Sequence, residues 1–283
     1  MIPLLRDTGS PRADAEADFL RARRLQVMAA LTARLLGKES GDRRALSFQE
    51  VVDALGLVDE VALGVQVIPV EQIVGSVDRV REFDPKFRPR TGLSRQRFER
   101  IDEAVRRGHP LPPIDVYRIG DIYFVRDGHH RVAVHRSLEL DSIEADVRLV
   151  RTLVEPDDVH AHSDLAAREL RKVFLQRVPV PRMARHALIL SDPEKYPWFA
   201  EMVEAWAARA MFGGGDRIDR HEAAHRWYAE EFAPVVKMIE DGDLLEKDET
   251  EADAYMRVAG ERYAVFHHHD WNAEIIAELG RRR

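Results

Sequence analysis

Two hydrophobic periodicities divide the chain. Before about residue 150, several short stretches alternate apolar and polar residues, as half-buried strands do, at 65–70, 116–119, 122–125 and 143–150. After residue 156 such runs nearly vanish, and apolar residues recur at spacings of three and four, which is typical of helices. The pattern predicts an α/β domain, a small mixed sheet with helices, followed by an all-helical domain.

Helical stripes also occur in the first half, at 11–37, 47–55 and 94–107. Ser47-Phe-Gln-Glu50 has the spacing of a capping box, in which the serine caps the helix start. In the second half the predicted helices are 165–173, 198–211, 221–231, 234–239 and 251–266. We therefore expect an N-terminal helix within residues 1–40, an α/β domain at 41–152 and a helical domain at 153–283.

The most informative stretch is residues 114–138. Two apolar runs flank Gly120-Asp121, and this dipeptide indicates a two-residue hairpin because glycine adopts positive φ without strain. The second run ends in Asp127-Gly128, where a helical pattern starts. The expected order is strand, turn, strand, Asp-Gly, helix.

This junction has the chemistry of an anion site. A helix start leaves backbone N–H groups without partners and carries partial positive charge. Gly128 lets a ligand approach the backbone, and His129, His130 and Arg131 add donors at the same end. The alternative is structural: Asp127 caps the helix and Gly128 only forms a tight turn.

The segment Asp127-Gly-His-His-Arg-Val-Ala-Val, placed after a strand, resembles the signature of the ParB/sulfiredoxin-like superfamily. Val67-Ile-Pro-Val-Glu-Gln-Ile-Val-Gly-Ser resembles the opening strand and short helix of the same superfamily. The resemblance covers about residues 65–150. It implies that the phosphates of a nucleotide are held at Gly128, His129, His130 and Arg131. The second half is faintly similar to an uncharacterised helical domain of bacterial proteins, which implies no function.

The resemblance also implies an activity. Phosphoryl transfer or nucleotide hydrolysis would use ATP, ADP or CTP with Mg²⁺, and Asp127 would hold the metal if it does not cap the helix. Arg79 and Arg81 lie in a basic stretch and are expected as further phosphate contacts; the alternative is an exposed loop whose charges pair with acidic residues. By analogy with the serine kinases of the superfamily, Glu71 or Asp78 would be the catalytic base.

Composition narrows these hypotheses. The chain has 283 residues, 45% hydrophobic and 33% charged, which is enough for two domains with sizeable cores. Because it contains no cysteine, disulfides and thiolate metal sites are excluded, and so is the sulfiredoxin reaction, which requires a cysteine in the matching motif. No run approaches the length of a membrane span, so we expect a cytoplasmic protein; the oligomeric state stays open, a homo-oligomer included.

The formal net charge is −7. This charge argues against a surface built to bind nucleic acid, although a local basic patch is compatible with it. A DNA-binding regulator that is switched by nucleotide is therefore the alternative function, and DNA is the less favoured partner.

A second alternative rests on His221-Glu-Ala-Ala-His225. On a helix the two histidines lie on one face, as a zinc hydrolase requires, with Glu222 as the base. Arg220 and Arg226 flank the motif, and no third ligand follows in a recognisable pattern. The simpler interpretation is an amphipathic helix packed by the aromatic residues that follow it.

Overall fold

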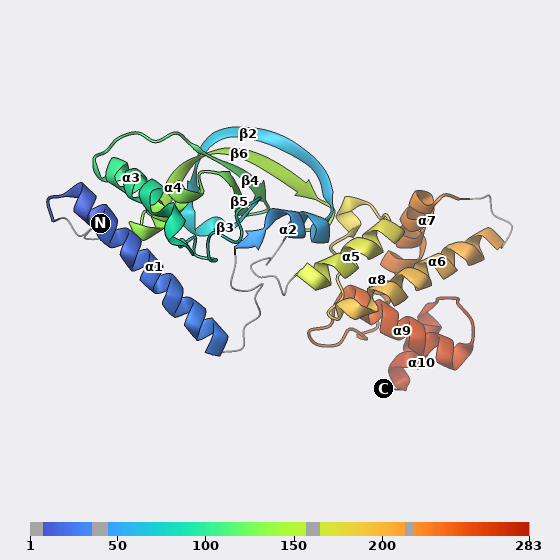
Figure 1. The fold of residues 1–283 in the computed structure, drawn as a ribbon. Coiled ribbons are helices and arrows are strands. Elements are labelled where there is room, and N and C mark those ends of the chain that lie inside the picture. The colour runs from blue at the N-terminus through green and yellow to red at the C-terminus, as the bar shows by residue number, and fades with distance from the viewer. Residues whose placement is uncertain (1–7, 36–44, 157–164, 213–217, 283) are drawn as a thin grey trace. The chain divides into compact units, whose positions relative to one another are not determined.

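The computed structural model of the chain describes residues 8–35, 45–156, 165–212 and 218–282 (Figure 1). The chain divides into two compact units, Met1–Ala166 and Ala167–Arg283. The predicted fold class is confirmed: the first unit contains a mixed sheet with helices, and the second is helical.

The first unit is built on a six-stranded sheet in the order β1-β3-β5-β4-β6-β2. The strands are β1 (Leu46–Ser47), β2 (Leu57–Pro69), β3 (Ile73–Ser76), β4 (Ile114–Ile119), β5 (Ile122–Asp127) and β6 (Ser142–Thr152). β4 pairs antiparallel with β5 and parallel with β6, while β3 pairs parallel with β5. The sheet thus places the end of β5 in its centre, beside β3 and β4.

The predicted hairpin is confirmed. Ile119 pairs with Ile122 across the turn, and Gly120 has a φ of 58°. That backbone conformation is why the turn favours glycine at its first position.

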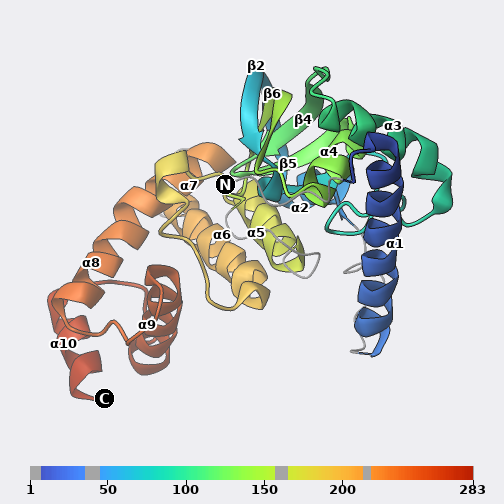
Figure 2. The same ribbon diagram turned by 90° about the vertical axis from the view of Figure 1, so that its left-hand side faces the viewer.

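In the described part of the first unit, four α-helices accompany the sheet: α1 (Pro11–Leu35), α2 (Phe48–Leu55), α3 (Arg95–Arg106) and α4 (His129–Ser137). α1 packs on α3, and α3 on α4. Figures 1 and 2 both show the N-terminal half of α1 beside α3. Buried residues from α1, α3, α4 and the sheet form one hydrophobic core, among them Phe19, Phe98, Val116, Val125 and Val132. This core fixes the position of α4 against the sheet.

α2 packs against the hairpin of β4 and β5, at residues that do not belong to the core just described. Ser47 caps it, since its hydroxyl accepts the N–H of Glu50 at 3.4 Å as the capping box predicts. Phe48 then stacks on Tyr117, with ring centroids 4.5 Å apart. Tyr117 is paired with Phe124 across β4 and β5 and alternates with the core residue Val116, so Phe48 covers the face opposite the main core.

Strand β2 is longer than predicted, Leu57–Pro69 rather than 65–70. It is an edge strand that pairs with β6, and most of its residues are exposed. Because neither face is well buried, residues 57–64 lack the alternation that marks a strand in sequence.

The second unit contains α5 (Leu165–Arg177), α6 (Tyr196–Phe212), α7 (Arg220–Trp227), α8 (Ala233–Asp241), α9 (Glu251–Phe266) and α10 (Ala273–Arg281). A π-helical turn, Tyr228–Phe232, joins α7 to α8. Aromatic rings form much of the core, including Phe199, Trp227, Phe232 and Tyr255. α10 was not predicted, although Asn272 caps it and Ile275, Ile276 and Leu279 bury one face.

Candidate functional site

The candidate site is the start of α4, where β5 ends. Gly128 is the N-cap residue, with a φ of 100°, and no side chain caps this helix. The expectation that Asp127 caps the helix is therefore wrong. Asp127 is the last residue of β5, and its exposed carboxylate pairs with Arg131 at 2.7 Å. The first-turn N–H groups consequently have no side-chain cap, which is the condition for an anion site.

Packing explains the glycine at position 128. A Cβ atom there would lie 2.4 Å from Cγ2 of Ile114 and would also require a strained positive φ. The side of Gly128 that would carry a side chain faces Ile114 in the core. Its role in the fold is thus independent of any ligand.

His129 is held by β3 and by the loop that follows it. Its Nε2 atom lies 2.7 Å from Oγ of Ser76, which also accepts the N–H of Arg79 at 2.9 Å. The imidazole stacks on Phe83, and its Nε2 lies 3.8 Å from a carboxylate oxygen of the exposed Asp78. Asp78 and Arg79, two of the predicted site residues, thus lie close to the start of α4.

Both histidines are buried. Burial lowers the pKa of His129 to about 4, against a smaller opposing effect of Asp78, and burial also lowers the pKa of His130 to about 4. Both rings are thus neutral at pH 7. Nε2 of His130 is fully buried and has no hydrogen-bond partner among the residues that the structure describes. The histidines contribute at most neutral N–H donors, and positive charge at this end must come from elsewhere.

Two arginines supply that charge. Arg79 and Arg97 both lower the pKa of His130, and Arg97 also lowers the pKa of Arg131. Arg97 lies on α3 and was missed in the sequence, since its proximity to α4 depends on how the two helices pack. Arg81 is exposed, and no contact ties it to the described residues of the helix start.

Arg131 has a different environment from the one expected. Its guanidinium donates to the carbonyls of Pro112 and Pro113, the latter at 2.7 Å, and to Asp127. Burial lowers its pKa from the ordinary arginine value. Its donors therefore anchor the connector that leads into β4, and only repacking would direct them at an anion.

The family model of the ParB N-terminal domain matches residues 63–157. Residues 63–157 are a ParB N-terminal domain. No curated protein and no solved structure matches the chain. The match begins within β2 and extends through β6, including α3 and α4, and it confirms the resemblance found at about 65–150, while the helical unit lies outside it.

The structure separates Glu71 from the start of α4 in the ParB N-terminal domain. Glu71 is exposed in the 3₁₀ turn Val70–Gln72 and lines a pocket of about 1040 Å³. Ala133 and Arg136, from the later turns of α4, line the same pocket. Of the two proposed bases, Asp78 thus lies near the helix start and Glu71 near the other end of the same helix.

The zinc-site residues lie outside the ParB N-terminal domain. His221, Glu222 and His225 are exposed on α7, and the backbone N–H of Glu222 bonds to the capping carboxylate of Asp219. Within the described residues, no group of three His, Cys, Asp or Glu side chains is arranged to hold a metal ion. The zinc alternative therefore gains no third ligand in this part of the chain.

No described helix has the length and apolarity to cross a membrane.

Proposed function

We propose that the ParB N-terminal domain binds the phosphates of a nucleotide at the start of α4. The observation that carries the proposal is an uncapped helix start beside two arginines, Arg79 and Arg97. Free N–H groups and the helix dipole favour an anion at such a position, and guanidinium groups add charge-assisted hydrogen bonds to phosphate oxygens. The proposed ligand is ATP, ADP or CTP.

Mg²⁺ fits this proposal only as a companion of the nucleotide. Asp78 and Asp127 both affect the pKa of His129, so two exposed carboxylates flank the helix start. Mg²⁺ is commonly bound by one or two carboxylates together with substrate phosphates, and Asp127 would hold it in that way, which leaves Asp78 available as a base. When bound, the ion would neutralise charge that develops on the phosphates.

Phosphoryl transfer or nucleotide hydrolysis is the activity that we propose for this site. Such reactions depend mostly on positioning and on charge stabilisation, which Arg79, Arg97 and the helix start would provide. Asp78 is the better candidate for the base, because Glu71 lies at the other end of α4. His130 would offer a neutral N–H rather than a charge.

The test is thermal melting of the full chain with ATP, ADP, CTP and GTP, each with and without Mg²⁺. A nucleotide at about a hundred times its dissociation constant should stabilise the protein by roughly 2.7 kcal/mol. Tripolyphosphate should reproduce part of this shift, and the nucleosides alone should not. The nucleotide that raises the melting temperature is then the one to use in an assay for phosphoryl transfer or hydrolysis.

Variants locate the binding. Arg79→Gln and Arg97→Gln should each reduce the nucleotide-induced shift, because each removes a cation next to the helix start. Arg100→Gln is the matched control, since Arg100 is exposed on α3 as well. The proposal fails if no nucleotide shifts the melting temperature, or if the shift is the same in all three variants and in the wild type.

A further inference from the structure

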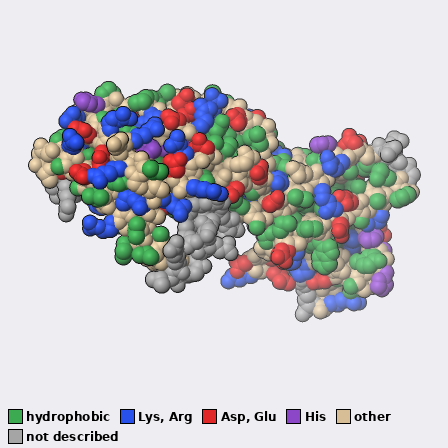
Figure 3. All heavy atoms as spheres, in the orientation of Figure 1, with side chains coloured by type: hydrophobic (Ala, Val, Ile, Leu, Met, Phe, Trp, Pro, Cys, Tyr) green, Lys and Arg blue, Asp and Glu red, His purple; other side chains and the backbone are tan. Residues whose placement is uncertain are grey.

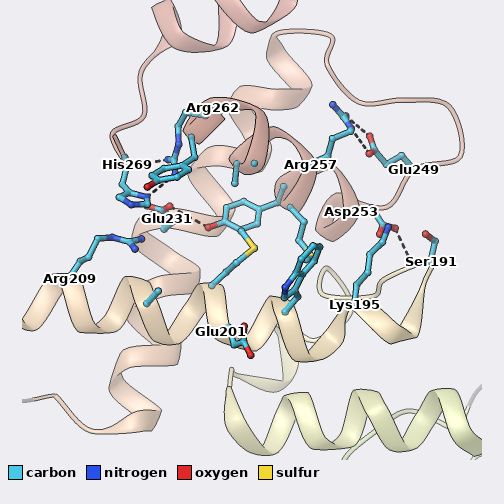
Figure 4. A pocket seen from close by; sticks show the side chains of 18 of the residues that line it. Ser191, Lys195, Glu201, Arg209, Glu231, Glu249, Asp253, Arg257, Arg262 and His269 are labelled. Carbon is cyan, nitrogen blue, oxygen red and sulfur yellow. Dashed lines mark hydrogen bonds and ion pairs between the residues drawn. The ribbon is translucent and has the colours of Figure 1, made fainter. Parts of the chain in front are cut away.

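The helical unit contains a groove of about 810 Å³ between α6 and α9, with additional residues from the loops around them (Figure 4). This volume lies in the usual range for small-molecule sites. Trp198, Met202 and Ala205 of α6 line one wall, and Met256 and Gly260 of α9 line the other. More of the lining is apolar than polar, as in most ligand pockets. The groove is separate from the nucleotide site proposed for the first unit.

Gly260 has no evident structural role in α9. It lies in the interior of the helix, where glycine is less favourable than alanine. A Cβ atom at this position would meet nothing within 4 Å, and the backbone does not adopt positive φ. The glycine therefore leaves open space on the wall of the groove, where a bound molecule can approach the helix backbone.

One end of the groove is polar and well ordered by hydrogen bonds. Glu231 lies in the π-helical turn, a distortion that often marks functional positions. One of its carboxylate oxygens accepts the hydroxyl of Tyr255 at 3.3 Å and the indole N–H of Trp271 at 2.9 Å. Tyr255 is almost fully buried, and Oε1 of Glu231 is thus occupied by two protein donors, while the carboxylate charge acts on Arg262 and His269.

The groups that remain at this end are donors. Arg262 is buried and stacked 4.0 Å over the ring of Trp271, and its guanidinium donates to the carbonyl of His269 and, at 3.4 Å, to Nδ1 of the same residue. Burial lowers the pKa of His269. Since Nδ1 of the neutral ring accepts, Nε2 carries the proton and is a donor.

Arg209 adds a cation. Figure 4 shows it rising from α6 toward Glu231 and His269. Its charge lowers the pKa of both Arg262 and His269, and no ion pair to Arg209 is found within the described residues. At the opposite end of the groove the charges balance, because the positive charge of Lys195 faces the carboxylate of Asp253 and helps to lower its pKa. The groove is thus apolar along its length, and at one end two cations, Arg209 and Arg262, face the single charge of Glu231.

We propose that this groove binds an amphipathic organic anion. Its carboxylate or equivalent head lies between Arg209 and Nε2 of His269, and its apolar body lies along Trp198 and past Gly260. The charge-assisted hydrogen bonds orient the head, and burial of the body against the two helices supplies most of the affinity.

The experiment uses the full chain and 8-anilinonaphthalene-1-sulfonate, an amphipathic anion whose fluorescence rises when it is buried. We expect decanoate or 4-phenylbutyrate to displace it, and the better competitor distinguishes an acyl from an aryl body. Arg209→Gln should weaken the binding of the two carboxylates about tenfold, as expected for the loss of one hydrogen bond to a charged group. Decanol, which has no charge, should bind equally well to this variant and to the wild type.

Two further variants make the result decisive. Gly260→Leu fills the groove and should abolish displaceable binding, and its melting curve shows whether the helix remains folded. Lys237→Gln removes an exposed charge from α8 that does not line the groove, and it should behave as the wild type. The proposal is overturned if decanoate displaces nothing, if Lys237→Gln weakens it as much as Arg209→Gln, or if a folded Gly260→Leu variant binds normally.

Discussion

Gly128 is constrained in two ways. Its positive φ excludes most side chains, and Ile114 occupies the place where a Cβ atom would lie. We expect Gly128→Ala to lower the free energy of unfolding by about 2–4 kcal/mol, the sum of the cost of left-handed backbone and of overpacking. Urea unfolding measures this change. Gly92→Ala is the control, because an added Cβ there meets nothing within 4 Å; equal losses in the two variants would show that Ile114 is not the cause.

Residue types predicted which groups gather at the helix start, but not which way they point. The spacing of Asp127 and Arg131 allows their ion pair, yet the carbonyls that hold Arg131 come from Pro112 and Pro113 in a distant connector. The burial of His129 depends on Phe83, which lies in a stretch that the sequence suggested was an exposed basic loop. Long-range packing therefore decided the protonation states, and no local pattern contains that information.

At the scale of the element, α4 makes the first unit sensitive to acid. The pKa values of His129 and His130 are lowered to about 4, and that of His135 is lowered as well, so the unfolded chain binds more protons below about pH 6.5. Stability is therefore complete above that pH and falls as the pH drops toward 4. Asp102 opposes this trend, because burial raises its pKa to about 6 and its folded form is protonated first.

The histidines outweigh Asp102 in number, so the net loss should be on the order of 2 kcal/mol between about pH 7 and pH 5. Urea unfolding of the full chain at the two pH values measures it. His129→Asn and His130→Asn should each reduce the pH dependence, since each removes one titrating group from the core. His109→Asn changes an exposed histidine after α3 and should leave the pH dependence of stability unchanged. A stability that is constant or rises toward pH 5 would contradict the assignment of neutral buried histidines.

Elements with a clear period and a capping signal were predictable. α9 was expected at residues 251–266 and has these bounds, and the hairpin of β4 and β5 followed from Gly120-Asp121. The first part of β2 was missed because an exposed edge strand shows no alternation. α10 was missed although Asn272 is a regular N-cap residue and Ile275, Ile276 and Leu279 bury one face. His267 ends α9 in the left-handed conformation.

At the scale of the whole molecule, local motifs identified one unit and left the other without a function. The signature at Asp127–Arg131 sufficed for the ParB N-terminal domain, because its residues are contiguous. The groove of the second unit combines Arg209, Glu231, Arg262 and His269, which are separated along the chain and belong to different elements. A site of that kind has no sequence signature, and it becomes visible only when the helices are packed.

Charge at the same scale bears on DNA. The formal net charge is −7, and Figure 3 shows basic and acidic side chains interspersed over the visible face. In the basic stretch, Arg88 is held in a mostly buried pair with Asp84 at 2.7 Å, whereas Arg79 makes only an exposed pair with Glu82 at 3.4 Å, which a bound phosphate can replace. Non-specific DNA binding arises from cations that are free to replace counterions on phosphates, and paired arginines do so poorly.

We therefore expect a short DNA duplex to bind with a dissociation constant weaker than about 10⁻⁴ M at physiological salt, with or without nucleotide. Fluorescence anisotropy at a low and a physiological salt concentration measures both the affinity and its salt dependence. Arg90→Glu should change neither the affinity nor its salt dependence, because we expect no basic surface of the protein to bind the duplex. The opposite result would be micromolar binding that weakens steeply with salt, appears only with nucleotide and is lost in Arg90→Glu. It would make the domain a nucleotide-switched DNA-binding module, with the nucleotide site as its control element rather than its active site.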